Sequence, residues 1–294
     1  MTYSIVACDD EHLGVATASH WIAVGSLVAW AEAGVGAVAT QAFTNPAYGP
    51  RALGSLAAGA AASTAVENII ADDPLRDLRQ VALIDAAGRT AHHTGPGCFP
   101  VTATNSDSNA VATGNMLAST QVPAEIQKTF TASIGSLAER LVAALAAGEE
   151  AGGDARGRQA AALLVVQKAP QPDTGLGIVV DLRVDDHPHP VAELGRLLNL
   201  HAEYAQISNA VFPSHTDVLT GASTHDLAET EAQLSGFVES FAGETRVEAT
   251  LWLALSHLRN GRREEAMRVL RQLPEMIPVV SSWNQHLSRR QVED

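Results

Sequence analysis

Residues 1–9 read Met-Thr-Tyr-Ser-Ile-Val-Ala-Cys-Asp, and this stretch decides how the rest of the chain is interpreted. Initiator methionine is normally trimmed when the next side chain is small, so Thr2 is expected to gain a free α-amine. That amine titrates at about pH 7.7–8.0 and can act as the threonine's own general base. The apolar, β-forming run from Tyr3 to Cys8 predicts a buried strand that holds Thr2 at the mouth of a sheet. The alternative is a first strand with an incidental hydroxyl.

Length, charge and cysteine content limit the class of protein. The 294 residues, 46% of them apolar, suffice for one or two globular domains. A net charge of −14 argues against nucleic acid or an anionic membrane as a partner. We find no long uncharged apolar run and no basic leader before a hydrophobic core, so neither a membrane span nor a secretory signal is expected. With only Cys8 and Cys98 as cysteines, we expect a cytoplasmic protein.

The order of predicted elements indicates the fold class. Strands are expected at residues 3–8, 13–18, 35–41, 79–85, 89–94, 109–117, 158–168 and 177–184. Helices are expected at residues 51–60, 64–72, 123–130 and 135–147, with Ser63 or Thr64 capping the second. Along the chain, groups of strands are separated by pairs of helices. A parallel sheet would instead alternate single strands with single helices. The order in this chain favours an α+β fold, a four-layer αββα sandwich of two mainly antiparallel sheets between helices.

The composition changes after residues 181–190, and a helix is expected at 190–204. Further helical patterns follow at residues 225–241, 245–259 and 262–273, the last two joined by Asn260-Gly261. We therefore divide the chain into a sandwich domain, residues 1–201, and a helical C-terminal extension, residues 202–294. The extension is either a dimerisation or docking module or a set of helices packed on the main domain with no separate role.

Several motifs, in this order along the chain, resemble one bacterial family. They are Thr2-Tyr-Ser-Ile-Val-Ala, Gly14-Val-Ala-Thr-Ala-Ser19, Gly34-Val-Gly-Ala-Val-Ala-Thr-Gln-Ala42, Asn45-Pro46-Ala-Tyr48-Gly49-Pro50, Gly114-Asn115, the stretch 151–160 and Asp181-Leu-Arg-Val-Asp-Asp-His187. Over residues 2–201 the chain resembles the DUF1028 family, a family of unknown function assigned to the N-terminal-nucleophile (Ntn) hydrolases. The resemblance implies the αββα fold and amide hydrolysis by the first residue of the mature chain.

Only Thr2 is carried over from that superfamily as a catalytic residue. Proteasome-like members tune the nucleophile with a lysine on a neighbouring strand, but no lysine precedes Lys128 here. Tuning would come from the α-amine, an arginine or backbone dipoles. The resemblance implies a hydrolase acting on a C–N bond, linear or cyclic, in a small molecule that can be anionic, without a cofactor. It also favours a homodimer or a higher homo-oligomer.

Strand ends supply the candidates nearest Thr2. Asn115 follows Gly114 at a strand end and is either an oxyanion donor or a turn asparagine. Ser19 and His20 end the second strand, and Thr40 and Gln41 end the third, so these four are candidate substrate contacts. For His20 a packing or loop role is the preferred alternative.

Two loops supply the remaining candidates. The first, with Asn45 and Tyr48, is either a pocket wall or lid, or a rigid connector. The second is glycine-rich and carries Asp154, Arg156, Arg158 and Gln159. Its acidic and basic groups either lock the loop as an internal ion pair or present an arginine to a substrate carboxylate.

A metal or nucleotide site is not expected. Carboxylates and imidazoles gather at residues 181–189, but their spacing matches no defined metal site and two prolines interrupt it. A charged strand end is the preferred interpretation. The Gly34-Val-Gly36 pattern lacks the rest of a dinucleotide fingerprint. The competing function is a catalytically silent sandwich used for ligand binding or assembly, because a fold does not guarantee a reaction.

Overall fold

The computed structural model describes residues 2–170, 176–211, 227–259, 261–278, 280 and 282. The chain forms two compact units, Met1–Leu198 and Asn199–Asp294. Each is described by itself.

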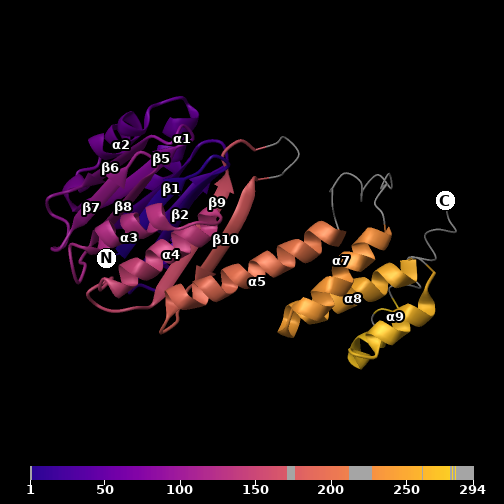
Figure 1. The fold of residues 1–294 in the computed structure, drawn as a ribbon. Coiled ribbons are helices and arrows are strands. Elements are labelled where there is room, and N and C mark those ends of the chain that lie inside the picture. The colour runs from indigo at the N-terminus through magenta and orange to yellow at the C-terminus, as the bar shows by residue number, and fades with distance from the viewer. Residues whose placement is uncertain are drawn as a thin grey trace. The chain divides into compact units, whose positions relative to one another are not determined.

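The first unit contains a six-stranded sheet with β1 near its centre (Figure 1). The strand order is β10-β9-β2-β1-β8-β7, and every pairing is antiparallel. All seven residues of β1 are buried, as its apolar sequence predicts. The strands are β1 (Thr2–Cys8), β2 (His12–Ser19), β7 (Ala103–Asp107), β8 (Ala110–Asn115), β9 (Ala160–Gln167) and β10 (Ile178–Val184).

A second, four-stranded antiparallel sheet has the order β3-β4-β5-β6. Its strands are β3 (Ala29–Glu32), β4 (Gly36–Ala42), β5 (Arg79–Asp85) and β6 (Thr90–Thr94). The sequence did not predict β3 or β7. Both are short edge strands, half-exposed or polar, so neither has the alternation that marks a strand.

Helices cover the outer face of each sheet, which completes the expected four-layer αββα sandwich (Figure 1). Helices α1 (Tyr48–Ala57) and α2 (Ala62–Ala71) pack on the four-stranded sheet through Ala52, Ile69 and Leu83. On the six-stranded sheet pack α3 (Val122–Ala132), α4 (Leu137–Glu150) and the start of α5 (Pro190–Val211).

The starts of α2 and α4 differ in whether a side chain caps the helix. The predicted cap of α2 is wrong, because the helix begins at Ala62 after Ala61 and no side chain caps it. By contrast, α4 begins with a capping box in which Ser136 and Glu139 exchange side-chain and backbone hydrogen bonds. The layer between the sheets is filled mainly by small and β-branched side chains, such as Val6, Val15 and Ala39.

The second unit is helical, as predicted. Beyond the end of α5 it contains α7 (Leu227–Ser240), α8 (Gly243–Arg259) and α9 (Arg263–Leu270). Short 3-10 turns occur at Pro274–Met276 here, and at Val24–Ser26 and Arg76–Leu78 in the first unit. Within the ranges that the structure describes, every helix is too short or too polar to cross a membrane.

Candidate functional site

Thr2 opens β1, and its side chain points into the layer between the two sheets. On the neighbouring strand β8, Asn115 lies directly opposite Thr2. On the other side, Ser19 ends β2 one position beyond the Tyr3–Ala18 pair. Directly opposed residues of antiparallel strands share one face of the sheet, so Asn115, Thr2 and Ser19 form a row. The Thr2 hydroxyl donates a hydrogen bond to Ser19 Oγ across 3.2 Å.

A buried hydrogen-bond network from the facing sheet closes over this row. Gln41 Nε2 donates to the Thr2 carbonyl at 3.2 Å and to Gln80 Oε1 at 2.7 Å. Asn115 Nδ2 donates to the same Gln80 oxygen at 3.0 Å, and Ser4 Oγ lies 2.6 Å from Gln41 Oε1. All of these side chains are buried. The network therefore fixes the orientation of both the Thr2 backbone and the Asn115 amide.

One atom of this network has no partner. Asn115 Oδ1 is buried and accepts no hydrogen bond from any residue that the structure describes. Leaving a buried polar atom unsatisfied typically costs about 1–3 kcal/mol. Such an atom, on the residue directly opposite Thr2, is placed to accept a hydrogen bond from a group that arrives there.

Strained backbone gathers at the same edge of the sandwich. Across the described ranges, the non-glycine residues with positive φ are Ala23, Ala42, Val101 and Met116, at 53°, 70°, 61° and 48°. Ala42 ends β4 and Met116 follows Asn115, while Ala23 follows the end of β2. Val101 accepts a hydrogen bond from Leu117 N at 3.1 Å. Left-handed backbone costs energy at such residues and clusters at functional sites.

The glycine-rich loop after α4 is locked by an internal ion pair. Asp154 is buried and accepts hydrogen bonds from the backbone N–H of His20 at 3.0 Å and from Arg156 Nη2 at 2.8 Å. Asp154 and Arg156 therefore form the internal ion pair that the sequence offered as one alternative. His20 contacts the loop through its backbone N–H. Gln159 lies on the surface and donates to Asp186 at 3.2 Å.

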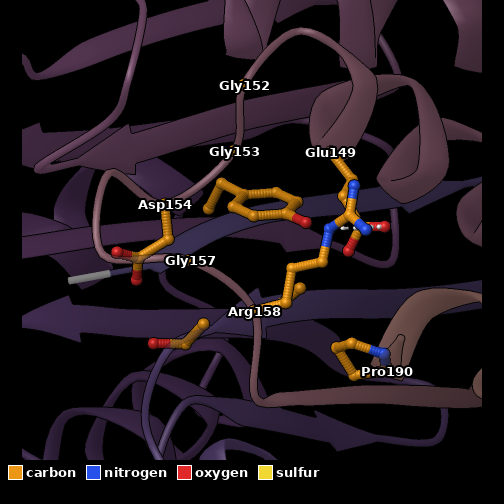
Figure 2. Close-up of a pocket in the computed structure, with 10 residues that line it drawn as sticks. Glu149, Gly152, Gly153, Asp154, Gly157, Arg158 and Pro190 are labelled. Carbon is orange, nitrogen blue, oxygen red and sulfur yellow. Dashed lines mark ion pairs between the residues drawn. The ribbon is translucent and has the colours of Figure 1, made fainter. Parts of the chain in front are cut away.

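A cavity of about 230 Å³ lies beside this loop (Figure 2). Arg158 and Glu149 meet in it, with Arg158 Nε 3.2 Å from Glu149 Oε1. Burial, followed by the Glu149 charge, raises the pKa of the Tyr3 phenol, so that group is uncharged at physiological pH. Ser19 also lines the cavity, which makes it the link between the cavity and Thr2. The lining residues are Tyr3, Ala18, Ser19, Glu149, Gly152, Gly153, Asp154, Gly157, Arg158 and Pro190.

The other loop holds candidates that lie apart from Thr2. Thr40 Oγ1 donates to the Asn45 carbonyl at 3.2 Å, and Asn45 Oδ1 accepts from Ala47 N, which makes a tight turn. Tyr48 is fully buried in the layer between α1, α2 and their sheet. Its hydroxyl donates to Asp73 at 2.8 Å. These contacts fit the rigid-connector alternative.

Residues 181–189 do not assemble as a metal site. Asp181 pairs with Arg183 at 3.2 Å, and Asp186 accepts from Gln159. Within the described ranges, no group of three or more acidic, histidine or cysteine side chains is arranged to hold a metal ion.

Burial raises the pKa of the Cys98 thiol, whose Sγ lies 3.2 Å from the Arg79 carbonyl.

Sequence reasoning missed Gln80, Tyr3 and Glu149. Gln80 is the second residue of β5 and the hub of the buried network. A signal was present, since an uncharged polar residue beside the apolar run Val81–Ile84 of a buried strand needs a buried partner. Tyr3 and Glu149 gave no comparable signal, because only the fold brings a strand start and a helix end together.

Comparisons with known proteins show the family to which the chain belongs. The chain belongs to the family of unknown function DUF1028, whose family profile matches residues 2–194. A crystal structure of a DUF1028 protein from Silicibacter pomeroyi is similar at 31% sequence identity and a TM-score of 0.62, covering 69% of this chain and 89% of that one. Anbu, an ancestral β-subunit from Yersinia bercovieri, aligns at 13% identity and a TM-score of 0.34, over 70% of this chain and 97% of its own. No curated protein matches the chain.

Proposed function

We propose that this protein is an N-terminal-nucleophile amidohydrolase that cleaves a C–N amide bond in a small molecule. Thr2 is the nucleophile once Met1 has been removed. The observation that carries the proposal is the row of Asn115, Thr2 and Ser19 at one edge of the sandwich. Beside Thr2 lies Asn115 Oδ1, which has no hydrogen-bond partner among the residues that the structure describes.

The proposed reaction proceeds in two steps. Thr2 Oγ attacks the amide carbonyl while the α-amine, directly or through one water, takes the hydroxyl proton. The tetrahedral intermediate collapses, the C–N bond breaks, and the same proton passes to the leaving amine. Water then attacks the acyl-threonine ester with the α-amine again as base, which releases the carboxylic acid and restores Thr2.

Asn115 has two roles in this proposal. Its Oδ1 accepts no hydrogen bond within the described part of the chain, so it can accept one from an N–H of the new α-amine and hold that amine beside Thr2 Oγ. Its amide nitrogen has two N–H groups, one of which donates to Gln80. The other N–H suits the oxyanion, and such a donor is worth about 3–4 kcal/mol of barrier.

Ser19 lies between Thr2 and the cavity. Thr2 is only 3% exposed, but Ser19 both accepts its hydrogen bond and lines the adjoining cavity. Strained residues follow the ends of β2 and β8, on either side of Thr2. This supports a preorganised site rather than an incidental hydroxyl.

The test combines mass spectrometry with a covalent probe. The intact mass of the purified chain should lack one methionine, and a β-lactone should then add once, as an ester on Thr2 Oγ. Thr2→Ala should abolish the addition, while Thr2→Ser should retain it. If Met1 is retained in every molecule, or if the probe labels Thr2→Ala equally, the proposed nucleophile is wrong.

A second candidate function is ligand binding without catalysis. The cavity, which is lined by neither Thr2 nor Asn115, favours it. A chain with intact ligand binding but no reaction at Thr2 would support this alternative. For either function we propose a homodimer or a higher homo-oligomer, which light scattering on the purified chain would test.

A further inference from the structure

The cavity lies on the opposite face of β1 from the Thr2 side chain. Successive side chains of a strand point to opposite faces, so Tyr3 faces the helices while Thr2 faces the other sheet. Tyr3 accordingly belongs to the core formed with α3 and α4, and it lines the cavity. A ligand held there would therefore contact a different set of groups from those that surround Thr2.

Glu149 brings an unsatisfied acceptor to this cavity. Its Oε1 lies 3.2 Å from Arg158 Nε, but its Oε2 is buried and has no partner in the described part of the chain. The side chain is 14% exposed and sits in the last turn of α4. A helix C-terminus carries partial negative charge, so a cation is favoured there. The group that fits Glu149 best is a protonated amine.

Arg158 offers the complementary charge beside it. Its Nε faces Glu149 and its Nη1 lies 3.4 Å from His189 Nδ1. Its Nη2 makes no hydrogen bond with the residues that the structure describes, and the side chain is 46% exposed. A guanidinium with unused N–H groups binds a carboxylate well. Figure 2 shows Arg158 and Glu149 side by side, joined by the dashed ion pair.

The size of the cavity limits the ligand. At about 230 Å³ it has room for roughly eight water-sized groups, taking about 30 Å³ for each. The Tyr3 ring forms one wall, and two glycines press against it. A Cβ at Gly148 would meet the ring at 3.3 Å, and one at Gly153 at 3.2 Å. The position of this wall is therefore fixed by close packing on both glycines.

We propose that this cavity binds a small α-amino acid, with its ammonium group on Glu149 and its carboxylate on Arg158. The two protein groups are already in contact, so the ligand's opposite charges must also be close together, as they are on one α-carbon. The Tyr3 ring, Ala18 and Pro190 would contact the side chain. The site does not depend on the proposed chemistry of Thr2.

Calorimetric titration of the purified chain tests this proposal with a matched set of probes. L-Valine has the expected size and both charges. Isobutylamine lacks only its carboxylate, and isovalerate lacks only its amine. We expect L-valine to bind saturably and each single-charge analogue to bind about tenfold more weakly or worse, because each leaves a charged partner unsatisfied. Equal binding of either analogue, or no saturation by L-valine, L-serine or L-leucine up to about 10 mM, would overturn the proposal.

Variants connect the binding to the named groups. Glu149→Gln keeps the shape but removes the charge, and we expect it to weaken L-valine binding by about tenfold. Glu150→Gln is the matched control on the exposed neighbouring residue and should bind normally. Thr2→Ala should also bind normally, so failure of the nucleophile and failure of this site are distinguishable. Undiminished binding by a folded Glu149→Gln protein would contradict the assignment.

Discussion

Thr2 and Ser19 are joined by a 3.2 Å hydrogen bond between their hydroxyl groups, each at the end of its strand. The threonine donates, so its proton points toward Ser19. A β-branched side chain has few rotamers, and this contact selects one of them. Ser19 is thus a positioning residue for the proposed nucleophile and also the wall that separates it from the cavity.

Replacing Ser19 by alanine should slow the reaction of Thr2 while leaving the fold intact. The lost acceptor frees the Thr2 rotamer, and misplaced reacting groups cost about tenfold to a hundredfold in rate. The rate of β-lactone addition, followed by intact mass, measures the effect. Ser106→Ala, on the exposed part of β7, is the control and should react at the normal rate. Equal rates for Ser19→Ala and the parent would remove the positioning role.

Asn115→Ala should have a larger effect on the same reaction. It removes both the proposed oxyanion donor and the acceptor for the α-amine, so addition should slow by about a hundredfold or more. Stability should fall by only about 1 kcal/mol, because Gln80 Oε1 keeps its bond from Gln41. Asn105→Ala, a half-buried site on the next strand, serves as the control. An Asn115→Ala protein that reacts at the parental rate would exclude Asn115 from the chemistry.

The sequence predicted the sandwich because its central strands have strong local signals. Buried strands such as β1 and β9 are rich in apolar and β-forming residues, and the helix pairs between strand groups differ from the alternation of a parallel sheet. The edge strands β3 and β7 were missed, because their residues are half-exposed or polar and therefore show no regular alternation of apolar and polar side chains. The prediction that Ser63 or Thr64 caps α2 was wrong for a related reason. Packing of Ala62 and Ala65, and not a capping side chain, determines where this helix starts.

The candidate site was predictable only in part, for a similar reason. Ser19 and Asn115 sit at strand ends, and antiparallel pairing alone brings these ends together beside Thr2. Gln41 also ends a strand, but it reaches Thr2 only because the second sheet packs face to face on the first. No sequence pattern, however, indicates that Tyr48 turns into the outer core or that Glu149 reaches Tyr3. Those placements depend on how the helices pack on the sheets, which is a property of the whole fold.

Asp73→Asn should destabilise the outer layer that holds Tyr48. Burial opposes ionisation of Asp73, but hydrogen bonds from Arg79, Leu75 N and Tyr48 outweigh it and hold its pKa well below the ordinary value. The buried pair has 2.9 Å between Arg79 Nε and Asp73 Oδ2. Removing the charge leaves Arg79 unpaired, at a cost of about 3 kcal/mol in the free energy of unfolding near pH 7.

That cost should shrink in acid. A carboxylate with a depressed folded-state pKa contributes stability above its unfolded pKa, about 3.9, and the contribution is lost as the pH falls further. Urea unfolding of the parent and Asp73→Asn, between about pH 7 and pH 3, measures the difference. Asp72→Asn, at the exposed neighbour, should show no such convergence. A constant difference between parent and Asp73→Asn at all pH values would contradict the ion-pair explanation.

Two glycines of α1 should respond in opposite directions to alanine. A Cβ at Gly49 would overlap the ring of Trp30 on β3, and that ring is held by a 3.1 Å hydrogen bond from Nε1 to the Leu27 carbonyl. The helix must shift from its sheet, so Gly49→Ala should lower the free energy of unfolding by about 1–3 kcal/mol. A Cβ at Gly54 meets nothing within 4 Å. There alanine only restricts the unfolded chain and favours the helix, so Gly54→Ala should raise stability by about 0.5–1 kcal/mol. Urea unfolding of both variants measures the two changes in stability. If Gly54→Ala lost as much stability as Gly49→Ala, close packing on Trp30 would not set the position of α1.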